Sequence, residues 1–186
     1  RDSSNNPVGL LVYGLQIETG SKATSYIPTA GSTVTRAADN LKLDTGTEPF
    51  VGFDGSQGTW VVKGNWTHTA STTQYIIAGD SASRFVWQGE GADDVSSYDG
   101  ATVITNSSVF PQSTNTAVVM SYLEGGAFNI LADGSAEATA SLTGDLATPQ
   151  IYIGGLNGAD LMNGHIHSVV YYPEQLPLAI RQGFSV

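Results

Sequence analysis

Turn-forming pairs interrupt this sequence so often that no long helix fits between them. Pairs such as Asp54-Gly55, Asp133-Gly134 and Asn157-Gly158 recur at the spacing of about 8 to 12 residues that is typical of β-sandwiches and barrels. Glycine supplies 22 of the 186 residues, against a usual share of about 7%. The runs between the turns are short and apolar, as strands are. We predict strands at residues 8–17, 41–43, 58–66, 74–78, 84–88, 102–105, 116–123, 127–132, 137–142, 150–153 and 164–172.

Side-chain alternation supports the strand prediction. In the run 58–66, Trp60 and Val62 share one face, and the residues between them share the other, as the two-residue period of a strand requires. Near the end of the chain, residues 174–182 predict one or two helical turns, with Pro177 near their start. The sequence therefore predicts an all-β fold of two antiparallel sheets that a short C-terminal helix closes.

Composition excludes several functions. The net charge of -10, with seven Lys and Arg residues, repels phosphate backbones and anionic membranes, so we expect no nucleic-acid partner. The chain has no cysteine, and therefore no disulfide, thiolate metal site or thiol nucleophile. No apolar run approaches the roughly 18 residues that span a bilayer, so we expect no membrane insertion.

Residues 23–38 differ from the rest of the chain. They contain few apolar residues, and Pro28 and Gly31 oppose a helix, so we predict an extended arm. We therefore divide the chain into an N-terminal strand and arm (1–39), the end of a preceding region, and a domain (40–186). Because the chain opens on Arg1 without a signal pattern, we expect it to come from a longer protein.

The strand and arm closely resemble a junction common in bacteriophage tail-fibre and other virion surface proteins. This resemblance implies a virion surface location after assembly in the bacterial cytoplasm, with other virion proteins as partners. Because the arm has few means of burying its own backbone, we also expect a homotrimer or larger symmetric assembly. The matching residues are Gln16, Glu18, Gly20, Thr24, Ser25, Tyr26, Ile27, Pro28, Thr29, Gly31, Ser32, Val34, Thr35, Arg36, Ala37, Ala38 and Asp39.

The second half of the chain carries Gly154-Gly155, Asn163-Gly164 and Tyr171-Tyr172 around an alternating strand. This pattern resembles concanavalin-A-like lectin/glucanase domains of the laminin-G type. Residues 154–176 match that family's closing signature, with Asn163-Gly164 before an alternating strand that ends in Tyr171-Tyr172. Residues 122–134 are similar to a hairpin of the same family. The resemblance covers residues 40 to 180 and implies a jelly-roll sandwich of two antiparallel sheets.

Catalysis is not expected. The β-glucanases of this fold carry two carboxylates on one strand, in a Glu-x-Asp-x-x-Glu string that is absent here. The nearest acidic cluster, residues 90–94, lies in a glycine-bounded loop, where solvated turn residues are the commoner interpretation. His165 and His167 lie two apart on a predicted strand and could pair on a metal, but a structural role is favoured.

Calcium is an open alternative. Related laminin-G-type domains hold this ion with loop aspartates, and carboxylate oxygens are the ligands it prefers. Turn formation explains the same residues without an ion, because Asp-Gly is favoured in turns. The candidate ligands are Asp80, Asp93, Asp94 and Asp99.

Aromatic residues give the remaining functional signal. A sugar stacks its apolar face on an exposed ring, while polar side chains bind its hydroxyls. Trp87 stands just before a predicted loop at residues 89–100 and Tyr98 lies near its end, with Gln88, Asp93 and Asp94 between them. Core packing is the alternative for Trp87, because large aromatics dominate sandwich cores. We therefore predict a carbohydrate-binding site at these five residues.

Three functions remain. The first is a non-catalytic carbohydrate-binding or adhesion domain of a phage virion surface protein, with a host cell-surface glycan as partner. The second is a purely structural virion module that binds no sugar. The third is an accessory carbohydrate-binding module of a bacterial polysaccharide-degrading enzyme.

Overall fold

In the computed structural model the chain forms two compact units, residues 1–37 and residues 38–186. The side chains of residues 86–88 are not described. The residues that the structure describes are 4, 14–17, 26–28, 30–35, 40–46, 52–67, 73–80, 85–88, 94–107, 115–144 and 146–184.

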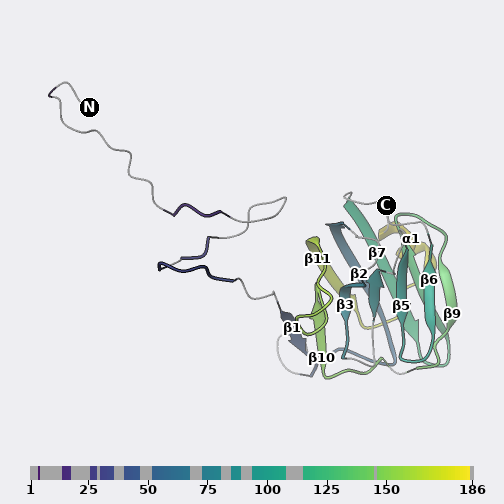
Figure 1. Cartoon of the computed structure of the whole chain (residues 1–186). Coiled ribbons are helices and arrows are strands. Elements are labelled where there is room, and N and C mark those ends of the chain that lie inside the picture. The colour runs from purple at the N-terminus through teal and green to yellow at the C-terminus, as the bar shows by residue number, and fades with distance from the viewer. Residues whose placement is uncertain are drawn as a thin grey trace. The chain divides into compact units, whose positions relative to one another are not determined.

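The larger unit is a sandwich of two antiparallel sheets (Figure 1). Sheet A has the strand order β1-β10-β3-β4-β5-β6, and sheet B has the order β11-β2-β7-β8-β9. This arrangement confirms the predicted all-β jelly roll. The strands are β1 (Leu41–Asp44), β2 (Gln57–Trp66), β3 (Gln74–Ala78), β4 (Val86–Gln88), β5 (Val95–Tyr98), β6 (Val103–Asn106), β7 (Asn115–Leu123), β8 (Ala127–Ala132), β9 (Ala138–Ser141), β10 (Gln150–Ile153) and β11 (Gly164–Tyr172).

The core lies between the two sheets and follows the alternation of the strands. Trp60 and Val62 of β2 are buried in it, with Tyr122 of β7 and Phe85 just before β4. Val61 faces the other way and packs in a second cluster on the outer face of sheet B. The predicted facing of β2 is therefore confirmed, and both faces of this strand are covered.

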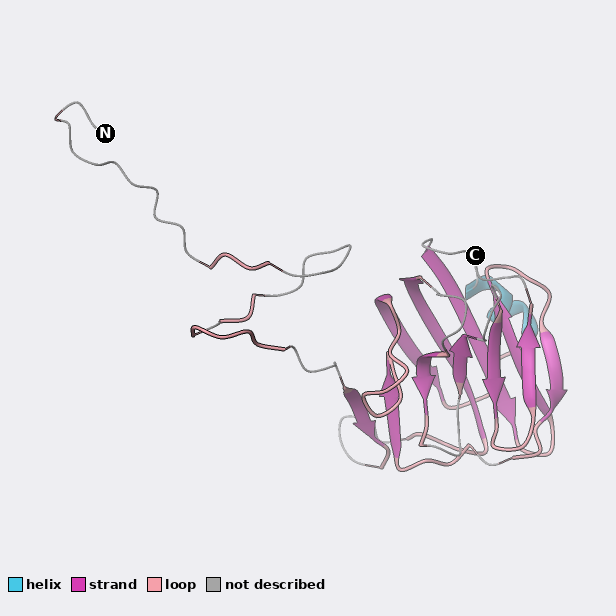
Figure 2. Ribbon diagram, in the orientation of Figure 1, coloured by secondary structure: helices cyan, strands magenta, loops and turns pink. Residues whose placement is uncertain are grey.

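The C-terminal helix α1 (Leu178–Phe184) confirms the predicted short helix and lies beside β7 (Figure 2). Its start differs from the prediction, because Pro177 stands before the first turn. The Pro177 carbonyl accepts the N–H groups of Ile180 at 3.0 Å and Arg181 at 3.1 Å. No helix in the described part of the chain is long and apolar enough to cross a membrane.

One predicted loop is wrong. Residues 89–100 were expected to form a loop, but β5 occupies residues 95–98. Val95 is fully buried in the core, and the Ser97 hydroxyl donates to the Phe85 carbonyl. Burial of the three consecutive residues Val95, Ser96 and Ser97 thus outweighs the turn preference of the two serines in this strand.

The N-terminal predictions are only partly covered by the described residues. Residues 14–17, the described part of the strand predicted at 8–17, form a bend and irregular backbone; the rest lies outside the described residues. Of the predicted arm, 26–28 and 30–35 are described and have no helix or strand. The Ile27 N–H donates to the Gln16 side-chain oxygen at 2.7 Å, which joins these two pieces of the smaller unit.

Candidate functional site

Strands β4 and β5 place two of the predicted sugar-binding residues, Trp87 and Tyr98, near each other. Trp87 is paired with Tyr75 of β3 on one side and with Ser96 of β5 on the other. Tyr98 lies two residues further along β5, opposite Val103 of β6. Positions diagonal to each other on neighbouring strands are within reach of aromatic side chains. The register therefore places Trp87 and Tyr98 at diagonal positions on adjacent strands of sheet A.

The described side chains around Tyr98 are held by hydrogen bonds. Tyr98 is half-buried, and its hydroxyl donates to the Gly100 carbonyl at 2.5 Å. The hydroxyls of Ser96 and Thr105 are 2.9 Å apart across β5 and β6. A partly exposed ring that is fixed before a ligand arrives loses little side-chain entropy on binding.

The polar members of the predicted site do not all share the face of Trp87 and Tyr98. Gln88 is paired with Val95, and Asp94 is the half-buried residue directly before that valine. Because Val95 lies in the core and paired residues share a face, position 88 is on the core-facing side of sheet A, opposite to Trp87 and Tyr98. Asp94 lies at the same end of the β4–β5 pair. Asp93 lies outside the described residues, so its predicted role stays a prediction.

Asp99 has a structural role that the sequence did not reveal. Its Oδ1 accepts the N–H groups of Ala101 at 2.8 Å and Thr102 at 2.5 Å, and its Oδ2 accepts those of Thr143 at 2.8 Å and Gly144 at 2.9 Å. Burial raises the pKa of Asp99, but these four backbone hydrogen bonds outweigh it and hold the pKa below its ordinary value. The carboxylate joins the β5–β6 turn to the segment after β9.

Of the other calcium candidates, the described residues Asp80 and Asp94 do not form a metal-binding group with Asp99. The Asp80 N–H donates to the Thr148 hydroxyl at 3.0 Å, whereas Asp94 precedes β5. Across the described ranges, no group of three or more His, Cys, Asp or Glu side chains is placed to hold a metal ion. Calcium binding stays a prediction that involves Asp93, which lies outside those ranges.

The histidine pair sits at an irregularity of β11. His165 is paired with Asn65, but the register shifts between Ile166 and Ser168, so His167 is the extra residue of a bulge. Both histidines are exposed. The two-residue spacing therefore does not give them the regular strand geometry that the sequence suggested.

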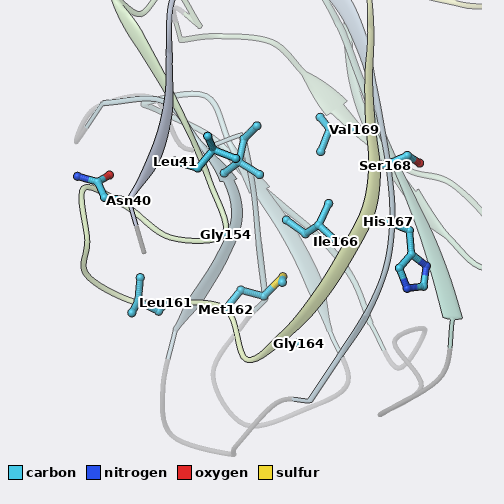
Figure 3. Close-up of a pocket in the computed structure, with 11 residues that line it drawn as sticks. Asn40, Leu41, Gly154, Leu161, Met162, Gly164, Ile166, His167, Ser168 and Val169 are labelled. Carbon is cyan, nitrogen blue, oxygen red and sulfur yellow. The ribbon is translucent and has the colours of Figure 1, made fainter. Parts of the chain in front are cut away.

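Sequence reasoning missed a cleft at the open edge of the sandwich (Figure 3). Its volume is about 730 Å³, within the range of roughly 300–1,000 Å³ usual for ligand sites. Edge strands β1 and β11 and the loop after β10 enclose it. Leu41, Leu161, Met162, Ile166 and Val169 point toward one another there. No local pattern could have joined these residues, because they come from segments far apart in the sequence.

The chemistry of the cleft differs from that of β4–β5. Its described lining is mainly aliphatic and contains no aromatic residue; His167 and Ser168 border it, but their side chains point away from the aliphatic ones (Figure 3). Leu41 is 57% exposed and Leu161 is 38% exposed. Such a lining fits an apolar group better than a sugar, which needs a ring face and several hydrogen bonds. The β4–β5 pair remains the better candidate for a sugar.

Comparison with known proteins gives a fold but no family. No protein-family model matches the chain, and no curated protein matches it. Solved structures do match. The CBM40 domain of the Ruminococcus gnavus IT-sialidase, bound to alpha2,6 sialyllactose, is 16% identical with a TM-score of 0.55, covering 70% of this chain and 84% of that one. Domain 4 of AbnA, an extracellular GH43 arabinanase from Geobacillus stearothermophilus in complex with arabinotriose, is 13% identical with a TM-score of 0.51, covering 70% and 67%.

A third match is to part of an enzyme. The Trypanosoma rangeli sialidase in complex with sialic acid is 17% identical with a TM-score of 0.55, but the match covers only 23% of that chain. At these identities the likeness establishes a shared lectin-like β-sandwich. What the similar proteins bind is a property of those proteins.

Proposed function

We propose that residues 40–186 form a non-catalytic carbohydrate-binding domain. The observation that carries this proposal is the match over 70% of the chain to a carbohydrate-binding module that is itself 84% covered. A second similar structure is an arabinanase domain in complex with arabinotriose, so two sandwiches of this shape occur with different sugars. The missing Glu-x-Asp-x-x-Glu string supports the absence of glycosidase activity.

The proposed binding face is the β4–β5 pair of sheet A. Tyr98 supplies a half-buried ring held by its bond to Gly100, and Trp87 lies at the diagonal position on the neighbouring strand. Asp93 and Asp94 are the proposed partners of the sugar hydroxyls, whereas Gln88 is at a core-facing position of β4. One or two rings and a few polar contacts favour a millimolar to micromolar Kd, about -4 to -8 kcal/mol, so adhesion would need several copies.

The biological setting that we propose is the surface of a phage virion, where the domain would bind a host glycan. The resemblance of residues 16–39 to a tail-fibre junction supports this setting, and a homotrimer would supply the copies that weak sites need. An accessory module of a polysaccharide-degrading enzyme fits the similar structures equally well. A structural module without glycan affinity is the third alternative.

Binding of the purified protein to a glycan array, followed by titration of the best ligand, tests the proposal. Tyr98→Ala should abolish binding, whereas Tyr98→Phe keeps the ring and should retain most of it. Trp87→Ala should also abolish binding, with a thermal midpoint measured beside it to separate unfolding from lost contact. An array without any ligand, or full binding by both alanine variants, would favour the structural alternative.

Two further measurements separate the settings. Incubation with laminarin, lichenan or a bacterial surface polysaccharide should release no reducing ends, and turnover that one acidic substitution removes would contradict the non-catalytic assignment. Light scattering of the chain should report a trimer or larger assembly under the virion hypothesis. A stable monomer from a reading frame that also encodes a glycoside hydrolase would support the accessory module.

A further inference from the structure

The bulge in β11 turns two consecutive side chains to the same side of sheet B. Ile166 and Val169 point into the cleft at the open edge, whereas His167 and Ser168 extend from the opposite side of the strand (Figure 3). In a regular strand, neighbouring side chains alternate. An extra residue in one strand of a pair re-aims side chains in this way, and such bulges are frequent beside functional sites.

A second pocket lies where His167 is directed. Its volume is about 350 Å³; it shares His167 with the cleft at the open edge, and its other lining residues are different. Strand β2 contributes Lys63, which is half-buried, and β11 contributes His167. Asn115 and Thr116 at the start of β7, together with Asp133 after β8, complete its polar lining. The pocket therefore gathers five polar side chains from four parts of sheet B.

The two basic groups of this pocket are unpaired. Within the described part of the chain, no hydrogen bond or ion pair engages the Lys63 ammonium or the His167 imidazole; the ion pair of the described residues joins Arg181 and Glu137. A half-buried cation without a counter-ion gains Coulomb energy from an anion brought beside it. The chain has a net charge of -10, whereas the formal charges of Lys63 and Asp133 balance in this pocket.

Asp133, the acidic residue of the pocket, already accepts hydrogen bonds from other groups of the protein. Asp133 has a φ of 45°, and its Oδ1 accepts the Ala117 N–H at 3.2 Å while its Oδ2 accepts the Thr116 hydroxyl at 3.3 Å. These bonds fix the carboxylate at the β8–β9 turn instead of bringing it to Lys63. It can still accept hydrogen bonds from ligand hydroxyls, because two carboxylate oxygens offer about four acceptor positions.

We propose that this pocket binds the carboxylate of an acidic sugar, with the Lys63 ammonium as the cationic partner, the His167 imidazole as a hydrogen-bond donor and Asp133 as an acceptor for a ring hydroxyl. It would be a second binding site, on the opposite sheet from β4–β5. That the carboxylate belongs to a sugar rests on the proposed function. The preference for a negatively charged ligand rests only on the two unpaired basic groups.

The test compares two probes that differ in one group. Methyl β-D-glucuronide carries a carboxylate where methyl β-D-glucoside carries a hydroxymethyl group. Titration of the isotope-labelled protein with each, followed by amide NMR, should shift signals of Ser168 and Ala117 with the glucuronide. The glucoside should bind this pocket about tenfold more weakly, because it lacks the charge-assisted hydrogen bonds.

Matched variants then assign the interaction. Lys63→Gln should weaken glucuronide binding about tenfold and His167→Gln by a smaller factor. Lys42→Gln removes the same charge from exposed β1 and should leave the affinity unchanged. Asp133→Asn keeps a residue that tolerates positive φ and removes a negative charge, so it should tighten glucuronide binding.

Several outcomes overturn the inference. Equal affinity for the two probes would show that the pocket has no preference for a carboxylate. Equal losses of glucuronide affinity in Lys63→Gln and Lys42→Gln would show a general electrostatic attraction to the protein and no specific contact with Lys63. The absence of glucuronide-induced shifts at Ser168 and Ala117 would also contradict it. The Tyr98→Ala variant separates the two proposals: it should leave glucuronide binding at Lys63 intact even where it abolishes binding at β4–β5.

Discussion

Arg181 of α1 donates to the Glu137 carboxylate at 2.8 Å, and both side chains are largely buried on the outer face of sheet B, at 7% and 12% exposure. The same guanidinium donates to the Ser121 hydroxyl at 2.6 Å. This ion pair ties the helix to the sheet. It also leaves each partner dependent on the other, since a buried charge without a partner is costly.

Arg181→Met should therefore destabilise the domain by about 3 kcal/mol, because it leaves the Glu137 carboxylate buried and unpaired. The double variant Arg181→Met/Glu137→Leu should recover most of this loss, since apolar residues of similar volume often replace buried ion pairs without cost. Urea denaturation of the parent and both variants measures the difference. A double variant as unstable as the single one would contradict this account.

The same pair predicts a pH dependence. Burial raises the pKa of Glu137, and Arg181 opposes that rise. In the Arg181→Met variant, burial still raises the pKa of Glu137, so the folded state binds a proton at Glu137 more readily than the unfolded state does. The penalty of Arg181→Met should thus be largest near pH 7 and should shrink as the pH falls toward the ordinary glutamate value of 4.5. A pH-independent loss would point to lost packing alone.

Most strands were predictable, because the two-residue period and the glycine turns are local signals. The predicted ranges 74–78, 127–132, 150–153 and 164–172 coincide with β3, β8, β10 and β11. Strand β5 was missed because its serines, set between Asp94 and Asp99, read as a turn. Only the core contact of Val95, which is a tertiary effect, identifies it as a strand.

The candidate sites were less predictable than the fold. Trp87 and Tyr98 could be named from residue type, but their diagonal positions follow from the register of β4 and β5. The pocket around Lys63 depends on a bulge that the alternating sequence His165-Ile166-His167 conceals. Arginine is rarely buried, so residue type also gave no sign of the Arg181 contact.

Asp99→Asn should destabilise the domain by roughly 3 kcal/mol, because the amide nitrogen cannot accept the N–H bonds that the lost oxygen accepted. Asp160→Asn makes the same chemical change at an exposed residue and should have little effect. Thermal denaturation compares the two. Equal midpoints for both variants would mean that the four bonds to Asp99 contribute little.

Acid unfolding offers a second measure of Asp99. Its folded pKa is lowered below the ordinary 3.8, so its contribution is present above that value and is lost as the pH falls through the folded pKa. The stability of the parent should therefore drop below about pH 4, and Asp99→Asn should show a shallower decline. Parallel curves for parent and variant would exclude Asp99 as a source of the acid sensitivity.

Alanine substitutions at two glycines, Gly64 and Gly183, should change the stability in opposite directions. A Cβ at Gly64 of β2 would lie 2.2 Å from the Trp66 ring and 2.6 Å from the His165 carbonyl, so Gly64→Ala should cost about 1–3 kcal/mol. At Gly183 of α1 nothing lies within 4 Å of the added carbon. Gly183→Ala should stabilise the helix by about 0.5–1 kcal/mol. Thermal midpoints that move in the same direction for both would contradict the predicted packing at one position.

Tyr122 and Tyr171 should resist ionisation in alkaline solution. The Tyr122 hydroxyl donates to the Asp54 carbonyl at 2.7 Å, and the Tyr171 hydroxyl donates to the Gln57 carbonyl at 3.1 Å. Burial raises the pKa of Tyr122 far above its ordinary value of 10, and it raises that of Tyr171 as well. The folded state therefore keeps these protons, and stability should fall as the pH rises above 10, where the unfolded tyrosines ionise.

Absorbance near 295 nm should show both residues ionising together with the loss of far-UV signal. The Tyr122→Phe variant should remove one tyrosine from that late step. It should also lower the free energy of unfolding by about 1 kcal/mol, because one hydrogen bond is lost. Ionisation of all the tyrosines before unfolding would show that this network does not hold its protons.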